Sequence, residues 1–573
     1  MSEEKEILLK RFILGVHAGH NASACIGDAR QLLYAVQEER LCGEKNYWGF
    51  PRRAIEACLR QVGATPGDVL SAGVGGRQVL IRYHSRDDVM QSYRRSDTFQ
   101  GRLLQRWALP LLIKYRPTYG QAEFRLAMSN AGLETVPQTF HDHHLAHAAT
   151  AYYGLRAAPD QQYLVLTCDG YGDGLCASIR VMGNGKCEDV ARVNWADSLG
   201  AIYSWITFNM GFVPLEHEYK LMGMAPYGST QGAEKIAQVF RSLLQLDASG
   251  LRFKRGTWQA MNAIGPRLMR ALRGERFDYI CAGLQLFTEE LLARWTANAV
   301  KATGVRHVLA AGGVFMNVKA NKRIAELPEV ESFQAFPSCG DETLSLGAYY
   351  LDAAKHFGDA EVPALQHFYL GDAPGDDSCL AAIKAAGLPY EKPADMARTV
   401  ADLLVSGQPV ARCCGPMEFG ARALGNRSIL ADPRNQDVVR VINQMVKKRD
   451  FWMPFAPMVK ESRQHDYVQN PKHLPSPYMM MTFDTKDNFR DFIAAVHNAD
   501  LTCRAQILRR EQNPAMHDIL DAFEAKTGCG IILNTSFNLH GFPIVRTPEE
   551  AIHVLKNSGL NFLQVGDYLV RKT

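Results

Sequence analysis

The feature that most constrains the fold is a pattern of short strands and tight turns that occurs twice in the first half of the chain. The first copy, FILGVHAGHNASACIGDARQLLYAVQEER, covers residues 12–40 and reads as three strands separated by a Gly/Asn turn and by the turn GDAR. The second copy begins YLVLTCDGYGDGLCASIR and covers residues 163–194 in the same order. Two copies of one strand–turn–strand–turn–strand unit predict duplicated α/β subdomains.

The superfamily of sugar kinases, Hsp70 and actin is built from such duplicated subdomains, which bind a nucleotide between them. The sequence predicts helices around these strands. One begins at Pro51 and carries an apolar stripe, others lie within residues 84–135, and a long one covers residues 277–304.

The composition of the chain changes between residues 356 and 378, where glycine, proline and aspartate become frequent and periodicity weakens. We therefore place the main boundary near residue 365. This choice divides the chain into an N-terminal domain, residues 1–365, and a C-terminal domain, residues 366–573, that mixes helices and strands.

The overall charge and hydropathy of the chain exclude several classes of protein. A net charge of +4 over 573 residues is too small to indicate a nucleic-acid-binding or polybasic membrane surface. Runs of about 18 apolar residues are absent from the sequence, and its first residues, MSEEKEILLKRF, contain no apolar signal core. We expect a cytoplasmic protein that binds neither nucleic acid nor membranes.

A histidine-rich stretch, HDHHLAHAATAYYG, occupies residues 141–154. His143 and His147 are four residues apart, so in a helix they share one face and approach each other closely enough to hold one ion. The metalloprotease pattern HExxH is absent, because His144 follows His143. The spacing alone leaves a structural histidine pair and a metal site equally open.

Two aspartates favour the metal site. Asp169 stands at the end of a predicted buried strand and before a glycine, where a carboxylate faces a cleft, and Asp341 precedes a helix rich in small residues. The alternatives are a turn role for Asp169 and a helix-capping role for Asp341. Together with the two histidines they form a nitrogen and oxygen ligand set that suits iron, manganese or zinc.

Two further stretches of the N-terminal domain contain candidate binding residues. In AAGGVFMN a strand runs into Gly312 and Gly313, whose N–H groups would be available to a phosphate or ribose, and Asn317 follows with an amide. In EYKLMGMAPYG, Glu218 and Lys220 precede a turn and are candidate binding residues. A solvated ion pair between them is an equally good interpretation.

Four stretches of the C-terminal domain combine basic side chains with amides and hydroxyls: MEFGARALGNRSILADPR, VKKRDFWMPFAP, VHNADLTCRAQ and LNTSFN. The pattern GxxxxGK[ST] is absent, and MGNGKC reads as a hairpin turn. This mixture indicates a pocket for a nucleoside triphosphate and a second phosphate, with a solvated surface as the alternative. The candidate residues are Glu418, Arg422, Arg427, Lys447, Lys448, Arg449, His497, Arg504, Asn534, Thr535, Ser536 and Asn538.

Eight motifs occur in the order found in one enzyme family: HHLAHAATAYY, DGYGDG, KLMGMAPYG, AGGVFMN, GDETLSLGAYY, MEFGARALGNRSIL, PFAP and LNTSFN. Over essentially its whole length the chain resembles the O-carbamoyltransferases of antibiotic and nodulation-factor biosynthesis. The resemblance implies an N-terminal actin-like (Kae1-like) duplicated domain, similar to the metal enzyme that transfers threonylcarbamoyl to tRNA. It implies that this domain is fused to a C-terminal α/β domain (YrdC-like), similar to the synthase of threonylcarbamoyl-adenylate.

The resemblance also implies the chemistry of the C-terminal domain. This domain would bind ATP with Mg²⁺ and carbamoyl phosphate, and would make carbamoyladenylate with release of pyrophosphate. Arginines and lysines would hold the phosphates, and the amides and hydroxyl would orient the nucleotide or the carbamoyl group. The phosphate-binding set is Arg422, Arg427, Lys447, Arg449 and Arg504, and the orienting set is Asn534, Ser536 and Asn538.

In the N-terminal domain the resemblance implies transfer of the carbamoyl group to a hydroxyl of a natural product or saccharide. His143, His147, Asp169 and Asp341 would hold a divalent metal, which is iron in relatives, and Gly312, Gly313 and Asn317 would hold the adenylate. His20, in GHNAS, and Lys45 would face this site, with a satisfied turn histidine as the alternative for His20. A homodimer is compatible with the resemblance.

The chain departs from the family pattern at three positions. Pro416 stands where relatives often carry arginine, Ala421 replaces a usual proline, and Met453 replaces a usual arginine before PFAP. These departures bring individual phosphate contacts into question. Two other interpretations stay open: a nucleotide-gated binding module of the Hsp70/actin type, and a carbamoyltransferase that modifies tRNA or matures hydrogenases.

Overall fold

The structure of this mixed α/β protein is a computed structural model that describes residues 11–96, 98, 116–362, 364–447 and 450–572. The chain divides into two compact units. The first unit contains Met1–Glu38 and Asn46–Gln366, and the second contains Glu39–Lys45 and His367–Thr573. The short segment Glu39–Lys45 therefore leaves the first unit, joins the second, and returns.

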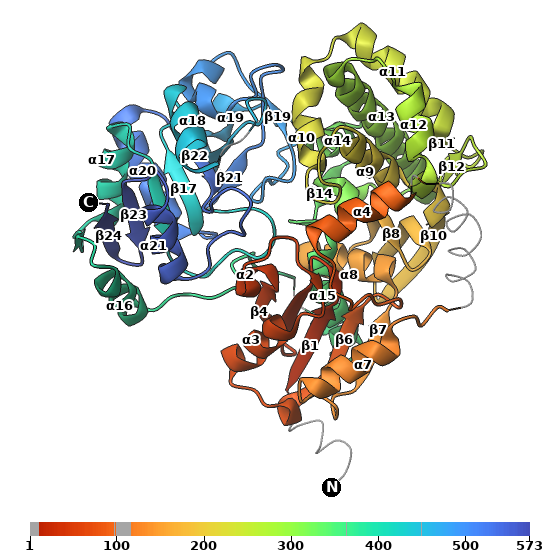
Figure 1. Cartoon of the computed structure of the whole chain (residues 1–573), viewed down its shortest axis with the longest axis horizontal. Coiled ribbons are helices and arrows are strands. Elements are labelled where there is room, and N and C mark those ends of the chain that lie inside the picture. Colours follow the sequence, from red (N-terminus) through yellow and green to blue (C-terminus); the bar gives the residue numbers. More distant parts are fainter. Residues whose placement is uncertain (1–10, 97, 99–115, 363, 448–449, 573) are drawn as a thin grey trace. The chain divides into compact units, whose positions relative to one another are not determined.

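Two five-stranded sheets with the same topology form the framework of the first unit within the described residues (Figure 1). In each sheet three antiparallel strands are continued by two parallel ones, so the predicted duplication is confirmed. In spatial order the sheets are β4 (Leu32–Gln37), β3 (Ser23–Gly27), β1 (Phe12–His17), β6 (Val69–Gly75) and β7 (Gln138–His141), and β10 (Lys186–Asn194), β9 (Leu175–Gly183), β8 (Tyr163–Gly172), β13 (His307–Ala311) and β14 (Ser332–Ala335).

Helices of the first unit pack on these sheets much as the sequence predicts. The helix after Pro51 is α3 (Arg52–Val62), which packs on β3 and β4, and the long helix is α13 (Phe277–Thr303). Of the helices predicted within residues 84–135, α4 (Arg86–Ser96) and α7 (Gln121–Asn130) are present, while residues 97 and 99–115 lie outside the described ones.

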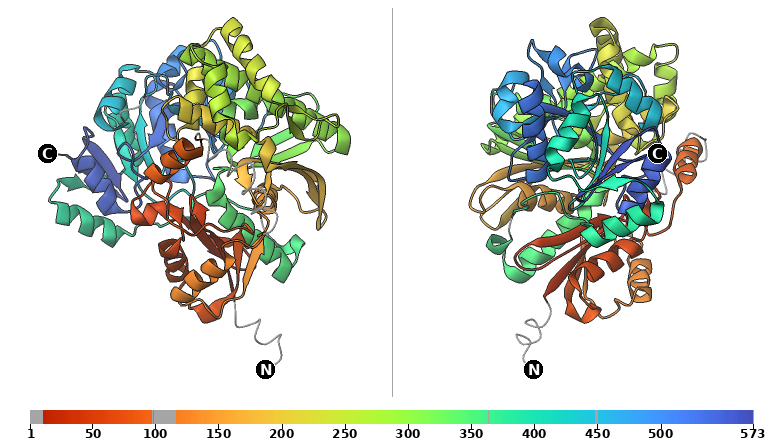
Figure 2. Two further views of the ribbon diagram at one scale, coloured as in Figure 1. Left: turned by 45° about the vertical axis from the view of Figure 1, so that its right-hand side comes forward. Right: turned by 90° about the vertical axis from the view of Figure 1, so that its left-hand side faces the viewer.

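Two helices pack between the two sheets of the first unit. Helix α8 (His143–Leu155) packs on β8, β9 and β13, and helix α15 (Leu344–Phe357) packs on β1 and β6, beside whose red and orange strands it appears in green in Figure 2. The two helices also pack on each other, and a Cβ atom at Gly347 would lie 2.0 Å from the carbonyl oxygen of Ala146. The small residues of α8 thus permit close helix–helix contact as well as packing on the sheet.

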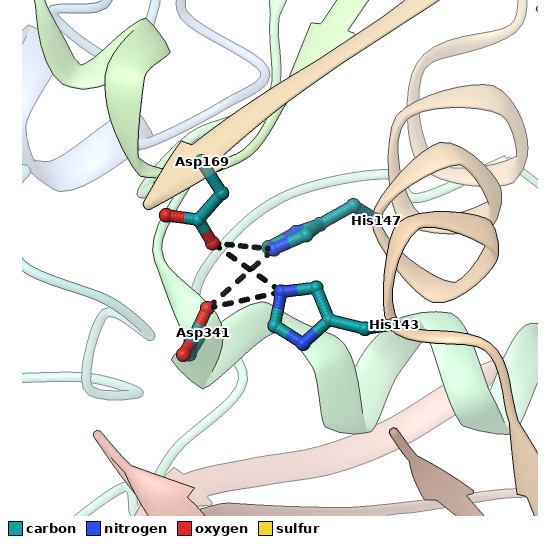
Figure 3. A group of neighbouring side chains, drawn as sticks. All are labelled: His143, His147, Asp169 and Asp341. Carbon is teal, nitrogen blue, oxygen red and sulfur yellow. Dashed lines mark hydrogen bonds and ion pairs between the residues drawn. The ribbon is translucent and has the colours of Figure 1, made fainter. Parts of the chain in front are cut away.

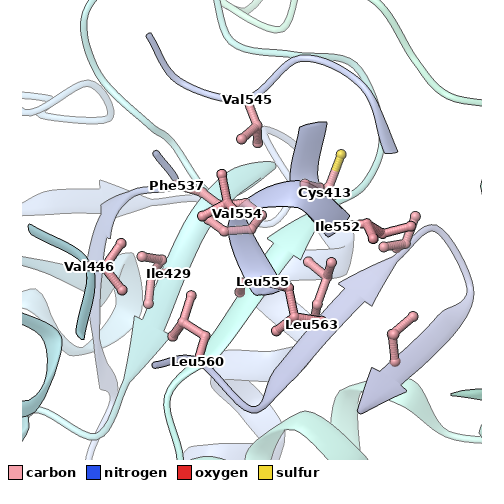
Figure 4. Close-up of a cluster of buried hydrophobic side chains, with 14 of the residues drawn as sticks. Cys413, Ile429, Val446, Phe537, Val545, Ile552, Val554, Leu555, Leu560 and Leu563 are labelled. Carbon is pink, nitrogen blue, oxygen red and sulfur yellow. The ribbon is translucent and has the colours of Figure 1, made fainter. Parts of the chain in front are cut away.

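The second unit is built on a mixed eight-stranded sheet in the part of the chain that the structure describes. Its apolar core includes Ile429, Leu555 and Leu563, all fully buried (Figure 4). In spatial order its strands are β15 (Tyr390–Glu391), β24 (Tyr568–Arg571), β23 (Phe562–Val565), β16 (Val410–Cys413), β17 (Arg427–Ala431), β22 (Ile531–Ser536), β18 (Ala456–Lys460) and β21 (Gln506–Leu508).

Two pairs of helices that are far apart in sequence pack beside this sheet. Helix α16 (Asp376–Ala386) packs on α21 (Pro548–Lys556), and α17 (Met396–Val405) packs on α20 (Pro514–Thr527). None of the helices among the described residues of either unit is long and apolar enough to cross a membrane.

Candidate functional sites

Four polar side chains converge in the first unit from three segments that are far apart in sequence (Figure 3). His143 and His147 come from the first two turns of α8, whose N-terminus is capped by Asp142. Asp169 lies near the end of β8, and Asp341 begins the 3-10 turn η7 (Asp341–Thr343) that leads into α15. Gly340 precedes this turn and no side chain caps it, so the structure excludes the capping role for Asp341.

The distances within this cluster fit a first-row metal ion. Nε2 of His143 lies 3.3 Å from Oδ2 of Asp169 and 3.6 Å from Oδ1 of Asp341, and the corresponding distances for His147 are 3.2 and 3.5 Å. An ion about 2.0–2.2 Å from each of two donors at the tetrahedral angle would hold those donors about 3.4 Å apart. The four histidine–aspartate distances match this spacing, and all four donors lie within 4.8 Å of one another.

The charges of the cluster lead to the same conclusion. Burial raises the pKa of Asp341, and the adjacent Asp169 carboxylate raises it further, to well above its usual value. Burial also raises the pKa of Asp169, but hydrogen bonds with His143 and His147 outweigh burial and hold it well below its usual value. Two carboxylates this close repel each other, so a positive charge between them, or a proton on one of them, stabilises the cluster.

Asp173 supports the histidine helix, and the sequence analysis did not identify it. Its carboxylate accepts hydrogen bonds from the backbone N–H of His143 at 2.8 Å and of Arg77 and Gln78 at 2.7 Å. A Cβ atom at neighbouring Gly172 would lie 2.2 Å from ring atoms of His143, so only glycine permits this approach. The second aspartate of DGYGDG was the sequence signal for this contact.

The turn after β13 is only partly as predicted. Gly312 adopts φ of 98°, which favours glycine, but its N–H already donates to the carbonyl of Cys339. A Cβ at Gly313 would lie 3.1 Å from Oδ1 of Asp169, which places this glycine beside the cluster. Asn317, predicted to contact the adenylate, has protein partners in this structure: its Oδ1 caps α14 (Val318–Ala325), and its amide exchanges hydrogen bonds with Gln285.

Lys220 and His20 both contact aromatic rings. Lys220 lies on helix α10 (Glu218–Met224), and its ammonium is 4.9 Å from the ring centroid of Phe212. Glu218 is not part of a solvated ion pair: it accepts hydrogen bonds from Ser204 and from the backbone of Leu215. His20 lies in β2 (Gly19–His20), which pairs with β5 (Trp48–Gly49), and its ring packs edge-on against Trp48.

In the second unit the loop that precedes β17 is organised around Glu418. This buried carboxylate accepts hydrogen bonds through Oε1 from the backbone N–H groups of Leu424 and Asn426 at 2.7 Å and of Arg427 at 3.2 Å. Its other oxygen, Oε2, is buried and has no hydrogen-bond partner among the described residues. A buried carboxylate oxygen without a protein partner is available to a donor from an ordered water or a ligand.

The predicted phosphate contact from Arg427 is wrong for this structure. Its side chain is fully buried, and its guanidinium donates to the backbone carbonyls of Cys414, Gly415, Asn426, Asp372 and Arg546. These bonds connect the loop before β17 to two other loops of the unit. The guanidinium therefore stabilises the backbone and does not face a ligand.

The amides near the end of β22 have mixed roles. Nδ2 of Asn534 donates to the carbonyl of Ala423 and to Gln506, while Oδ1 is buried without a partner in the described structure, as is Oγ1 of Thr535. Ser536 donates to Oδ1 of Asn538, whose amide donates in turn to backbone carbonyls of its own loop. Thus Asn534 and Thr535 retain acceptors for a ligand, whereas the Asn538 amide holds its loop.

The remaining predicted residues of the second unit are only partly described. Nδ1 of buried His497 accepts a hydrogen bond from the backbone N–H of Ala499. Arg422 and Arg504 are half-buried. Lys447 is the last residue of the π-helical turn Asn443–Lys447, and only the backbone of Lys447 is described. Lys448 and Arg449 lie outside the described residues.

Comparison with known proteins assigns the family. Residues 12–350 match the family model described as carbamoyltransferase N-terminus, and residues 401–572 match the model described as carbamoyltransferase C-terminus. The chain belongs to the carbamoyltransferase family and is a transferase. This assignment replaces the alternative of a nucleotide-gated binding module and confirms the resemblance seen in the motifs.

Two similar relatives are nodulation proteins. The chain is 30% identical to nodulation protein NolNO of Sinorhizobium fredii, over 96% of this chain and 79% of that protein. It is 30% identical to nodulation protein NolO of Bradyrhizobium diazoefficiens, over 75% of this chain and 79% of that protein. Among solved structures it resembles HypF of T. kodakarensis at 13% identity and a TM-score of 0.35, over 61% of this chain and 49% of that one.

Proposed function

We propose that this protein is an ATP-dependent O-carbamoyltransferase that works in two steps, one in each unit. The second unit, a YrdC-like domain, makes carbamoyladenylate from carbamoyl phosphate and ATP. The first unit, an actin-like domain, transfers the carbamoyl group to a hydroxyl of a small molecule. The observation that supports the proposal most strongly is the convergence of two histidines and two aspartates from distant segments in a chain of this family.

The proposed first step consumes carbamoyl phosphate, water and ATP and yields carbamoyladenylate, orthophosphate and pyrophosphate. Water first cleaves carbamoyl phosphate to carbamate and orthophosphate. A carbamate oxygen then attacks the α-phosphorus of ATP, and the bond to pyrophosphate breaks. The unpartnered acceptors Glu418 Oε2, Asn534 Oδ1 and Thr535 Oγ1 would orient amino or hydroxyl donors of these substrates, and Arg422, Lys447, Arg449 and Arg504 would hold their phosphates.

In the proposed second step an acceptor hydroxyl attacks the carbamoyl carbon, AMP leaves, and the hydroxyl proton is released. His143, His147, Asp169 and Asp341 would hold a divalent ion, most consistent with Fe²⁺, which supplies Lewis-acid polarisation of the carbamoyl oxygen. Gly313 lies beside this cluster, and its missing side chain leaves space there for the adenylate. Asp173 and Gly172 fix the position of the histidine helix.

The proposed acceptor is a hydroxyl of a natural product or saccharide, because the two named relatives are nodulation proteins. The family assignment leaves open the modification of tRNA, but a net charge of +4 does not favour such a large anionic substrate.

The proposal is tested by supplying ATP, Mg²⁺ and carbamoyl phosphate to the full-length protein. We expect exchange of labelled pyrophosphate into ATP that depends on carbamoyl phosphate. With a panel of hydroxylated metabolites, mass spectrometry should then show the gain of one carbamoyl group on an acceptor, together with AMP. A protein that shows no carbamoyl-phosphate-dependent exchange would contradict the adenylate route.

A further inference from the structure

A segment from the first 45 residues belongs to the second unit. Glu39–Lys45 clusters with His367–Thr573, although Glu38 before it and Asn46 after it belong to the first unit. Its helical part, α2, covers Glu39–Cys42. The C-terminal module therefore includes an element that the family models assign to the N-terminal region of the chain.

Arg40 attaches this segment to the second unit. Its side chain is 3% exposed, and its Nη2 donates to the carbonyl of Gly420 at 2.8 Å. Its Nη1 is directed to the carbonyl of Ile544 at 3.5 Å and lies 3.2 Å from the carboxylate of Glu39. A guanidinium suits this position because its planar fork reaches two acceptors at once, whereas an ammonium is a point charge.

One of these carbonyls lies in the loop that carries Glu418, and the other lies in the loop that follows the strand of Asn534 and Thr535. Gly420 lies between Glu418 and Arg422, and its φ of 96° gives its peptide an orientation that favours glycine. Ile544 lies in the loop that follows β22, the strand of Asn534 and Thr535. The backbone N–H of the next residue, Val545, donates to the carbonyl of Phe537, which lies just after that strand.

We propose that Arg40 is a positioning residue for adenylate formation in the second unit. It fixes the loop around Gly420 relative to the loop around Ile544, and so sets the spacing between Glu418 and the end of β22. This inference rests on the proposed function of the second unit. It predicts that a substitution near the N-terminus impairs the reaction of the C-terminal module while the metal cluster of the first unit is unaffected.

The test uses full-length wild type, Arg40→Met and Arg40→Lys, with Arg52→Met as the matched control. Arg52 is an exposed arginine in α3, and its guanidinium pairs with Glu56 one helical turn away. Carbamoyl-phosphate-dependent exchange of labelled pyrophosphate into ATP is measured as a function of both substrates, and bound metal is measured by elemental analysis.

We expect Arg40→Met to lower kcat/KM for exchange about 10- to 100-fold, mainly through higher KM, because small displacements of binding groups have effects of this size. Arg40→Lys should be intermediate, since an ammonium reaches one carbonyl, and Arg52→Met should match wild type. Metal content should be equal in all four proteins. A residue that merely stabilised the fold would lower the active fraction, and so kcat, with KM unchanged.

Exchange by Arg40→Met within about twofold of wild type, or a change in kcat alone, would overturn the inference. If Arg40→Met does not fold, Arg40→Lys decides: a raised KM supports the inference, and wild-type constants overturn it. Failure of the proposed function would differ, because wild type itself would then show no exchange that depends on carbamoyl phosphate.

Discussion

The same kind of sequence reasoning predicted the polar cluster of the first unit better than the polar loop of the second unit. In the first unit the four residues named from their motifs, including His143 and Asp341, lie together with donor distances that suit an ion. In the second unit Arg427, named with equal reason, is buried among backbone carbonyls. The comparison shows that convergent metal ligands have few other uses, whereas a buried arginine serves backbone and phosphate equally well.

The largest expected effect concerns the first unit. Asp341→Ala should remove one of four ion ligands and lower carbamoyl transfer about 10³-fold or more, while pyrophosphate exchange in the second unit continues. Metal content by elemental analysis and the two half-reactions measured separately check this outcome. Asp87→Ala, at an exposed position, is the matched control. Loss of both activities in a folded Asp341→Ala protein would contradict the division of chemistry between the units.

A second prediction separates the two kinds of arginine in the second unit. Arg427→Met removes the donor of five hydrogen bonds to backbone carbonyls, so we expect the free energy of unfolding to fall by about 3–5 kcal/mol. Arg422→Met should change it by less than about 1 kcal/mol and instead lower pyrophosphate exchange. Denaturant unfolding followed by circular dichroism, combined with the exchange assay, distinguishes them. Equal stability losses would mean that Arg422 is also structural.

A third prediction tests the support of the metal ligands. The Asp173 carboxylate accepts hydrogen bonds from three backbone N–H groups. Asp173→Asn keeps the shape of the side chain but replaces one of its two acceptor oxygens by an NH₂ group, which is a donor. Substitution of a residue that orients a metal ligand typically lowers metal affinity by about 10- to 100-fold. We therefore expect the metal affinity of Asp173→Asn to fall about 10-fold or more. Titration of the metal-free protein with Fe²⁺ under anaerobic conditions measures this. An unchanged affinity would show that α8 is positioned by its packing alone.

The last prediction is a dependence of stability on pH from His17. Burial lowers the pKa of His17 to about 3, from an ordinary value of 6.5. The unfolded chain therefore binds more protons than the folded one between these values, so stability is full above about pH 6.5 and falls as the pH is lowered toward about 3.

Thermal unfolding at several pH values should show that His17→Gln loses less stability on acidification than wild type does. His553→Gln, at an exposed position, serves as the control and should follow wild type. Identical pH profiles for wild type and His17→Gln would indicate that His17 is protonated in the folded protein. Its two ring nitrogens, which face the carbonyls of Gly75 and His20, would then both donate.

The sequence by itself predicted the sheets of the first unit and the four side chains that converge there. Strand patterns at residues 12–40 and 163–194 predict both sheets because burial and turn chemistry are local properties. His143, His147, Asp169 and Asp341 were identifiable because each stands at the end of a predictable element, where a side chain of that type must face a common edge.

Only the tertiary structure decided which polar side chains form hydrogen bonds within the protein. Neither the amide pair of Asn317 with Gln285 nor the five carbonyls around Arg427 is visible in sequence, because every acceptor is a backbone group or lies far away along the chain. For the same reason the sequence did not reveal that Glu39–Lys45 joins the second unit. A hydrogen bond depends on where its partner lies in space, and long-range packing sets that position.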